Sequence, residues 1–233
     1  MAWILNEMET MRKCSQGASL TRYNDGELGY AFRGWSHRLQ PIDGKLVERL
    51  REVFHADVPG LLVGVPRVLP PDDDSLPVST KWCQRFWNGS WQNFVRKQLH
   101  EDRQYASGFA SYPDRHVPRE QWPEFIELCD ATWAGGDVVL VGSRADCIEG
   151  TRGIDAIKGT ATLEFVEIPP KRFWAAYDDT LQRLLDFPRH SLMLVAAGVP
   201  GTVLAHDLHV EGFQAVDIGR LPLRLRLHMG IEQ

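Results

Sequence analysis

Short runs of hydrophobic residues alternate with amphipathic segments along most of the chain. The runs are bounded by turn-forming residues and predict buried strands at residues 19–23, 61–65, 137–141, 162–166, 191–196 and 214–218. Between them, apolar residues recur at every third or fourth position, which predicts helices over residues 4–14, 44–55, 80–100, 119–133, 170–185 and 201–211. Strands that alternate with helices in this way are typical of βαβ units.

The central strands are apolar at every position. Residues 138–141 read VVLV and residues 192–195 read LMLV. Strands of this kind occur where helices cover both faces of a parallel sheet, because neither face then meets water. We therefore predict an α/β fold with a Rossmann-like, doubly wound, mostly parallel sheet and helices on both faces.

Length and composition favour one domain. The chain has 233 residues, of which 43% are hydrophobic and 24% are charged, which suffices for one sizeable core but not for two. We therefore expect residues 1–233 to form a single domain. The net charge of −5 argues against a nucleic-acid partner, because phosphate binding depends on a clustered excess of Lys and Arg.

The sequence predicts neither export nor a membrane span. The N-terminal segment MAWILNEMET carries acidic residues where a signal peptide would need positive charge. No apolar run approaches the roughly 20 residues that cross a bilayer. We expect a cytoplasmic protein.

Candidate chemistry gathers in the loops that follow the predicted strands. In an open parallel sheet, ligands bind at the carboxyl ends of the strands, where the following helices direct their positive N-termini. These loops are residues 24–27 (NDGE), 142–144 (GSR), 169–172 (PPKR), 198–202 (GVPGT) and 219–220 (GR). Two acids, glycine turns and several cations on one edge suit a metal-bound diphosphate.

Asp25 and Glu27 flank Gly26 directly after the first predicted strand. In an extended or gently turning backbone, residues two apart project to the same side, so both carboxylates would address one cation. Gly26 would let a phosphate approach the main chain closely. Hard divalent cations prefer such oxygen ligands. Glu7 and Glu9 form the same acid-x-acid pattern, so the pattern alone is not specific. The metal-site interpretation of Asp25 and Glu27 depends on their position after a strand.

Two other segments are candidate sites. Residues 196–208 (AAGVPGTVLAHDL) join a strand to a helix, and their Pro and Gly residues suit an anion-binding helix start. They match neither the dinucleotide G-x-G-x-x-G pattern nor the P-loop. The acidic run at residues 72–74 (DDD) follows two prolines and is predicted to lie on an exposed loop.

Several motifs together resemble a known family. The segment TRYNDGE at residues 21–27 resembles the R-[FY]-x-D-G-E opening of the bacterial GT-D fold glycosyltransferases, a family long known only as a domain of unknown function. Residues 39–54, 61–66, 137–143 and 168–179 are similar to successive segments of that family, and residues 196–221 resemble its C-terminal signature. The resemblance covers nearly the whole chain.

The resemblance implies a nucleotide-sugar donor and a divalent cation, Mn²⁺ or Mg²⁺, handled by a D-x-E motif that falls on Asp25 and Glu27. It places the following residues at patterned positions around the donor: Arg22, Lys171, Gly198, Pro200, Gly201 and Thr202, with Asp207 and Asp217 in a structural role. Loop position adds Gly26, Gly142 and Arg144 to the expected donor site. The chain departs from the pattern at Asn24, where Gly is common, and at Arg220, where His is usual.

The expected reaction is transfer of a hexose, glucose in the first instance, from a UDP-sugar to a hydroxyl group of a glycan or glycoprotein. Asp25 and Glu27 would position the metal, and either acid is a candidate for the base on the acceptor hydroxyl. Two alternatives use the same sheet. One is an S-adenosylmethionine-dependent methyltransferase, which needs no metal, and the other is a non-catalytic module that binds nucleotide sugars.

Overall fold

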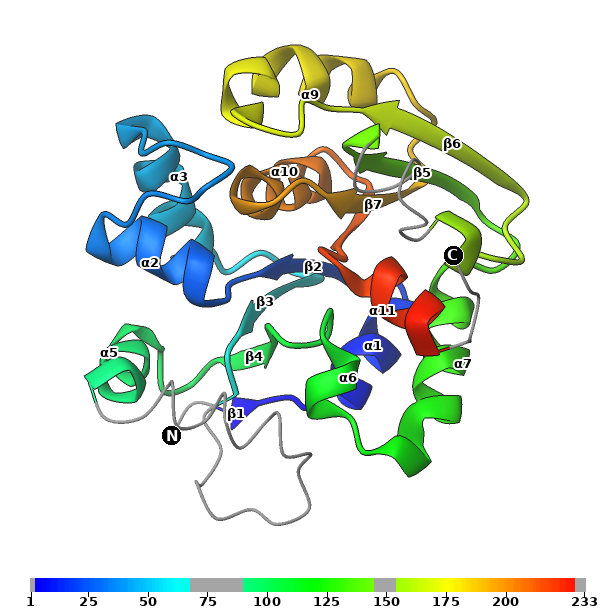
Figure 1. Ribbon diagram of the computed structural model, residues 1–233, viewed down its shortest axis with the longest axis horizontal. Coiled ribbons are helices and arrows are strands. Elements are labelled where there is room, and N and C mark those ends of the chain that lie inside the picture. Colours follow the sequence, from blue (N-terminus) through cyan, green and yellow to red (C-terminus); the bar gives the residue numbers. More distant parts are fainter. Residues whose placement is uncertain (1–2, 68–89, 145–153, 229–233) are drawn as a thin grey trace.

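Eight parallel strands form one sheet in the computed structural model of the chain, which describes residues 3–67, 90–144 and 154–228. The spatial order is β1-β4-β3-β2-β8-β7-β5-β6 (Figure 1). The strands are β1 (Trp3–Ile4), β2 (Ser19–Arg22), β3 (Leu61–Val65), β4 (Gln104–Ser107), β5 (Asp137–Gly142), β6 (Thr162–Glu167), β7 (Leu192–Ala196) and β8 (Gln214–Asp217). All paired strands run in the same direction, so their carboxyl ends share one edge.

Helices cover both faces of the sheet (Figure 1). One face carries α2 (Asp25–Arg33), α3 (Gly44–His55), α5 (Ser90–Gln98), α9 (Tyr177–Leu185) and α10 (Val199–Val210). The other face carries α1 (Glu7–Ser15), α6 (Pro113–His116), α7 (Trp122–Trp133) and α11 (Leu221–His228). Within the described residues, short 3-10 turns connect these elements: η1 (Arg119–Gln121), η2 (Ile154–Ala156) and η3 (Phe173–Ala176).

The apolar strands account for this doubly wound arrangement. Successive side chains of a strand point to opposite faces. Accordingly Val139 and Val141 pack into the core under α10, whereas Val138 and Leu140 pack into the core under α7. A polar residue on either face of such a strand would be buried in one of the two cores. The predicted Rossmann-like, doubly wound parallel sheet is confirmed.

The six predicted strands are all present, and two further strands were not predicted. The predicted helix at residues 4–14 begins instead at Glu7, because Asn6 caps it and accepts the Glu9 N–H at 2.8 Å. The predicted helix at residues 80–100 is described only from Ser90 onward as α5. Residues 80–89 and the acidic run at 72–74 lie outside the described part of the chain.

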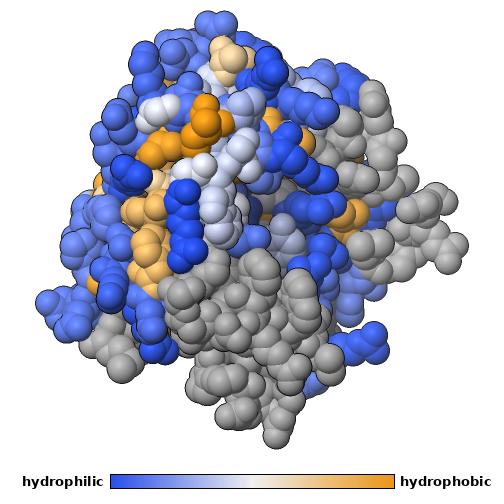
Figure 2. Space-filling model, turned by 60° about the vertical axis from the view of Figure 1, so that its left-hand side comes forward, coloured by the Kyte–Doolittle hydropathy of each residue, from blue (hydrophilic) through white to orange (hydrophobic). Residues whose placement is uncertain are grey.

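The surface seen from the side of α2 and α3 is mainly hydrophilic, with apolar side chains in small groups (Figure 2). The large exposed apolar side chains of the described residues are Trp35, Ile42 and Val210. Within the same residues, every helix is too short or too polar to cross a membrane.

His116 is a buried histidine whose ionisation opposes folding. Only 3% of it is exposed, and its ring stacks on Phe109 with 4.0 Å between centroids. Burial, aided by the charges of Arg67 and Arg115, lowers the pKa of His116 to about 3. Because the ring has its ordinary pKa when unfolded, the unfolded chain takes up a proton first as the pH falls below about 6.5. Stability is therefore lost on acidification through this window.

We expect His116→Phe to reduce the acid sensitivity of the fold. Between pH 7 and pH 5, the wild type should lose about 2 kcal/mol more of its unfolding free energy than the variant does. Urea unfolding of both proteins at both pH values measures this double difference, in which the contributions of the carboxylates cancel. Equal losses in the two proteins would mean that His116 takes up its proton with the same pKa in the folded and unfolded states.

Candidate functional site

A pocket of about 230 Å³ opens at the carboxyl ends of β2, β8 and β7. It lies where ligands bind in open parallel sheets. Its lining combines acids, cations and glycines with an apolar wall: Arg22, Asn24, Asp25, Gly26, Glu27, His37, Arg38, Leu39, Tyr112, Leu140, Ile154, Ala196, Gly198, Gly219, Arg220, Pro222 and Leu223. The loops after β2, β7 and β8 therefore meet in one pocket, as the strand-end argument predicts.

Asp25, Gly26 and Glu27 form the first turn of helix α2, and the predicted extended turn is wrong. Asn24 has an extended backbone and precedes the helix. Its N–H donates to the Glu27 carboxylate at 3.0 Å, which is the return half of a capping box. Residues two apart on a helix do not face the same side. The two acids nevertheless reach the same pocket, because Glu27 turns back over the start of the helix while Asp25 stays exposed.

The same capping arrangement occurs at α1. Residues 6–9 read NEME, as residues 24–27 read NDGE. The Glu9 carboxylate accepts the Asn6 N–H at 2.8 Å. The acid-x-acid pattern thus marks a helix start in both places, and only the second start borders the pocket.

Arg22 and Asp217 form a buried ion pair at the base of the pocket. Arg22 is 5% exposed and Asp217 is 3% exposed, and the Arg22 Nη2 lies 3.4 Å from Oδ1 of Asp217. Burial, with a smaller contribution from the nearby Glu27, raises the pKa of Asp217 to about 6 although the charge of Arg22 acts to lower it. At neutral pH both partners are therefore charged.

The Arg22 guanidinium keeps one donor unused. Its Nε is buried and has no hydrogen-bond partner among the described residues. Gly219 passes directly over this group, since a Cβ at Gly219 would lie 2.2 Å from the Arg22 Nη2. Glycine at this position gives the guanidinium the space to reach the pocket lining.

A second, smaller pocket of about 40 Å³ adjoins the first. It shares Leu39, Ala196 and Gly198 with the larger pocket. Lys171 and Pro200 line only the smaller one. The predicted donor residues are thus divided between two neighbouring spaces.

Four predicted donor residues line neither of these pockets. Gly142 ends β5, and its carbonyl accepts the Ile168 N–H at 3.0 Å. Arg144 is exposed and lies 3.3 Å from Glu167. Gly201 and Thr202 are buried in α10, where the Thr202 hydroxyl donates to the Arg22 carbonyl at 3.0 Å. Thr202 therefore supports the strand that carries Arg22.

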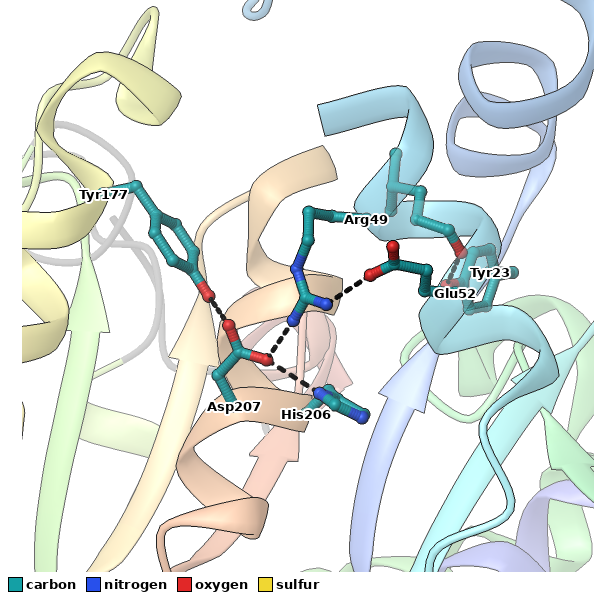
Figure 3. Close-up of polar contacts among 7 residues, drawn as sticks. Tyr23, Arg49, Glu52, Tyr177, His206 and Asp207 are labelled. Carbon is teal, nitrogen blue, oxygen red and sulfur yellow. Dashed lines mark hydrogen bonds and ion pairs between the residues drawn. The ribbon is translucent and has the colours of Figure 1, made fainter. Parts of the chain in front are cut away.

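Asp207 joins three helices away from the pocket (Figure 3). Its carboxylate lies 2.6 Å from Arg49 of α3 and accepts the Tyr177 hydroxyl of α9 at 2.7 Å. Burial raises the pKa of Asp207, but hydrogen bonds from His206 and Tyr177 and the charge of Arg49 outweigh it and leave the pKa below its ordinary value. Asp207 stays ionised and ties α10 to its neighbours.

Sequence reasoning missed His37, Arg38 and Tyr112 as lining residues. His37 and Arg38 lie in the loop after α2, a helix that the hydrophobic pattern did not predict. The N-x-x-E pattern at residues 24–27 resembles a capping box, and it could have predicted the start of that helix.

Comparison with known proteins identifies relatives over nearly the whole chain. The family model described as "Glycosyltransferase GT-D fold" matches residues 20–223. The protein named "Probable glycosyl transferase Gly" from Streptococcus gordonii is 25% identical over 222 residues, which cover 88% of this chain and 30% of that protein. The chain thus spans about 30% of the length of this curated relative.

Solved structures show the same fold. One is described as "The highly conserved domain of unknown function 1792 has a distinct glycosyltransferase fold", and it has a TM-score of 0.83 at 24% identity over 98% of this chain and 82% of that one. Another, "A New Glycosyltransferase (DUF1792) from Streptococcus sanguinis", has a TM-score of 0.83 at 22% identity over 99% of this chain and 86% of that one.

Proposed function

The chain belongs to the glycosyltransferase GT-D fold family, and from this premise we propose the reaction that its pocket supports. The protein transfers a hexose, glucose in the first instance, from a UDP-sugar to a hydroxyl group of a glycan or glycoprotein. A divalent cation, Mn²⁺ or Mg²⁺, takes part at the pocket between β2, β8 and β7. The observation that carries this proposal is the presence of two carboxylates and the buried Arg22 guanidinium in one pocket at a helix N-terminus.

The carboxylates of this pocket fit a hard cation that takes its other ligands from elsewhere. Asp25 and Glu27 both line the space, and one Glu27 oxygen already accepts the Asn24 N–H. Among the described residues, no group of three or more His, Cys, Asp and Glu side chains is placed to hold a metal. Mg²⁺ and similar ions are commonly bound by one or two carboxylates together with water and substrate phosphates. Asp25 and Glu27 would hold the ion, which when bound would neutralise charge on the departing diphosphate.

The chain's own cations and backbone serve the rest of the diphosphate. Arg22 lines the pocket from a fixed, buried position, so little side-chain freedom is lost on binding. The N-terminus of α2 presents main-chain N–H groups and a partial positive charge. Arg38 and Arg220 are exposed at the rim and add positive charge there. Gly26 and Gly198 keep the backbone accessible between these groups.

Calorimetry with UDP tests the proposal. We expect UDP to bind the protein at least about tenfold more tightly with Mn²⁺ than without it, because a cation held by Asp25 and Glu27 would supply positive charge to the diphosphate. UDP-glucose should release UDP in the presence of the protein and Mn²⁺. Metal-independent binding of S-adenosylhomocysteine would favour a methyltransferase instead. UDP binding without transfer of the sugar to any of a panel of acceptors would favour a binding module.

A further inference from the structure

A tight turn at residues 37–40, here called the 37–40 turn, forms the partition between the two pockets. His37 and Arg38 line the larger pocket, Gln40 lines the smaller one, and Leu39 lines both. The turn is closed by two reciprocal main-chain hydrogen bonds between His37 and Gln40, at 3.2 and 3.0 Å. Its conformation is therefore fixed locally.

Contacts with a distant segment hold the 37–40 turn over the sheet edge. The Leu39 carbonyl accepts the Arg172 N–H at 2.7 Å. Gln40 is 5% exposed, and its side-chain oxygen accepts the Trp174 N–H at 3.2 Å. These partners belong to the segment that follows β6, so the turn is anchored to a part of the chain far away in sequence. A side chain that it presents to the pocket is preorganised for binding.

The His37 ring has a defined hydrogen-bonding polarity. Its Nδ1 accepts the Leu39 N–H at 3.3 Å. A neutral imidazole that accepts at one nitrogen carries its hydrogen on the other. The Nε2 of His37 is therefore a donor. It cannot at the same time offer a lone pair to a metal.

The donor edge of His37 lies against the first turn of α2. A Cβ built on Gly26 would be 3.6 Å from Cδ2 and 3.9 Å from Nε2 of His37. This places the Nε2–H beside the residue between Asp25 and Glu27, on the lining of the larger pocket. An N–H donor beside a helix N-terminus, in a pocket that Arg22 also lines, matches an anionic oxygen rather than a cation.

We propose that His37 contacts the nucleotide sugar and donates a hydrogen bond from its Nε2–H to the diphosphate. The inference rests on the proposed function, because it takes the diphosphate to lie at the first turn of α2. It adds a phosphate ligand from a loop that no strand-end rule identifies. It also makes the 37–40 turn part of the donor site.

Calorimetry of UDP with Mn²⁺ tests this role in wild type, His37→Phe and His37→Gln. Phe keeps a flat ring against Gly26 but has no donor, whereas the Gln amide can donate again. We expect His37→Phe to weaken UDP binding about tenfold or more, the usual range for one hydrogen bond to a charged group. His37→Gln should stay within about threefold of wild type by the same reasoning. Melting temperatures establish that each variant is folded.

His190→Phe is the matched control, because His190 contacts Asp137 at 3.0 Å at the amino ends of the strands. It should bind UDP as wild type does. Equal UDP affinity in wild type and His37→Phe would overturn the role of His37 and leave the proposed function standing. A loss of Mn²⁺ affinity in His37→Phe, measured without nucleotide, would overturn it in favour of a metal ligand. Absence of UDP binding in wild type would overturn the proposed function itself.

Discussion

Asp25→Asn is expected to abolish sugar transfer without unfolding the protein. Asp25 is exposed at the start of α2 and lines the pocket, so its carboxylate is free to act on a ligand and adds little to the core. Removing one of the two carboxylates that would hold the cation, and with it positive charge at the departing diphosphate, should lower kcat/KM about 100-fold or more. Release of UDP from UDP-glucose, with Mn²⁺ and an acceptor, measures the loss. Activity within about threefold of wild type would remove Asp25 from the mechanism.

Glu27→Gln should give a comparable loss for a related reason. Gln retains an oxygen that can accept the Asn24 N–H, so the helix cap survives while the charge is lost. Glu9→Gln is the matched control, because Glu9 caps Asn6 in the same way at 2.8 Å and lies away from the pocket. Both Gln variants should unfold at similar urea concentrations to wild type. Only Glu27→Gln should lose activity.

Gly108→Ala is expected to destabilise the fold by about 3 kcal/mol, near the upper end for overpacked sites. A Cβ at Gly108 would lie 2.4 Å from the Tyr23 carbonyl oxygen and 3.1 Å from Oδ1 of Asn24. Both neighbours belong to the segment that leads from β2 into α2. Because main-chain atoms cannot rotate away as a side-chain end can, the segment must shift. The start of α2 should move with it, so activity should fall as well.

Gly44→Ala provides the control for Gly108→Ala. Gly44 begins α3, and a Cβ there would meet no atom within 4 Å. Ala at such a position should leave the unfolding free energy unchanged or raise it by up to about 1 kcal/mol. Urea unfolding of both variants gives the comparison. Equal stabilities would mean that the β2–α2 connection adjusts without cost.

Strand prediction worked where burial on both faces left a continuous apolar signal. The central strands β5 and β7 are the clearest cases, since their alternate side chains pack into the two cores on opposite faces of the sheet. The strand β1 has two residues, and β4 reads QYAS, so neither carries such a pattern. These two edge-side strands are defined by pairing with each other and with β3. Pairing of that kind is a tertiary effect that local sequence does not encode.

The candidate site was predictable as far as the strand-end rule reaches. Asp25, Glu27 and Gly198 lie in loops that follow predicted strands, Arg22 ends β2, and the structure brings these residues into one pocket. The predicted conformation of the two acids was wrong, because an Asp-Gly pair suits a turn as well as a helix start. His37 could not be found this way. Its position depends on contacts between the 37–40 turn and residues 172 and 174, which are far away in the chain.

The place of β8 in the sheet has a consequence for biosynthesis. Strands β1 to β4 pair among themselves, as do β5 to β7, and β8 lies between β2 and β7. A nascent chain therefore carries two partial sheets with open edges until residues 214–217 emerge from the ribosome. At about 5–20 residues per second, the interval between β2 and β8 lasts about 10 to 40 s. During that time the open edge of β2 invites pairing with other chains, so chaperone supply should raise the yield of active enzyme.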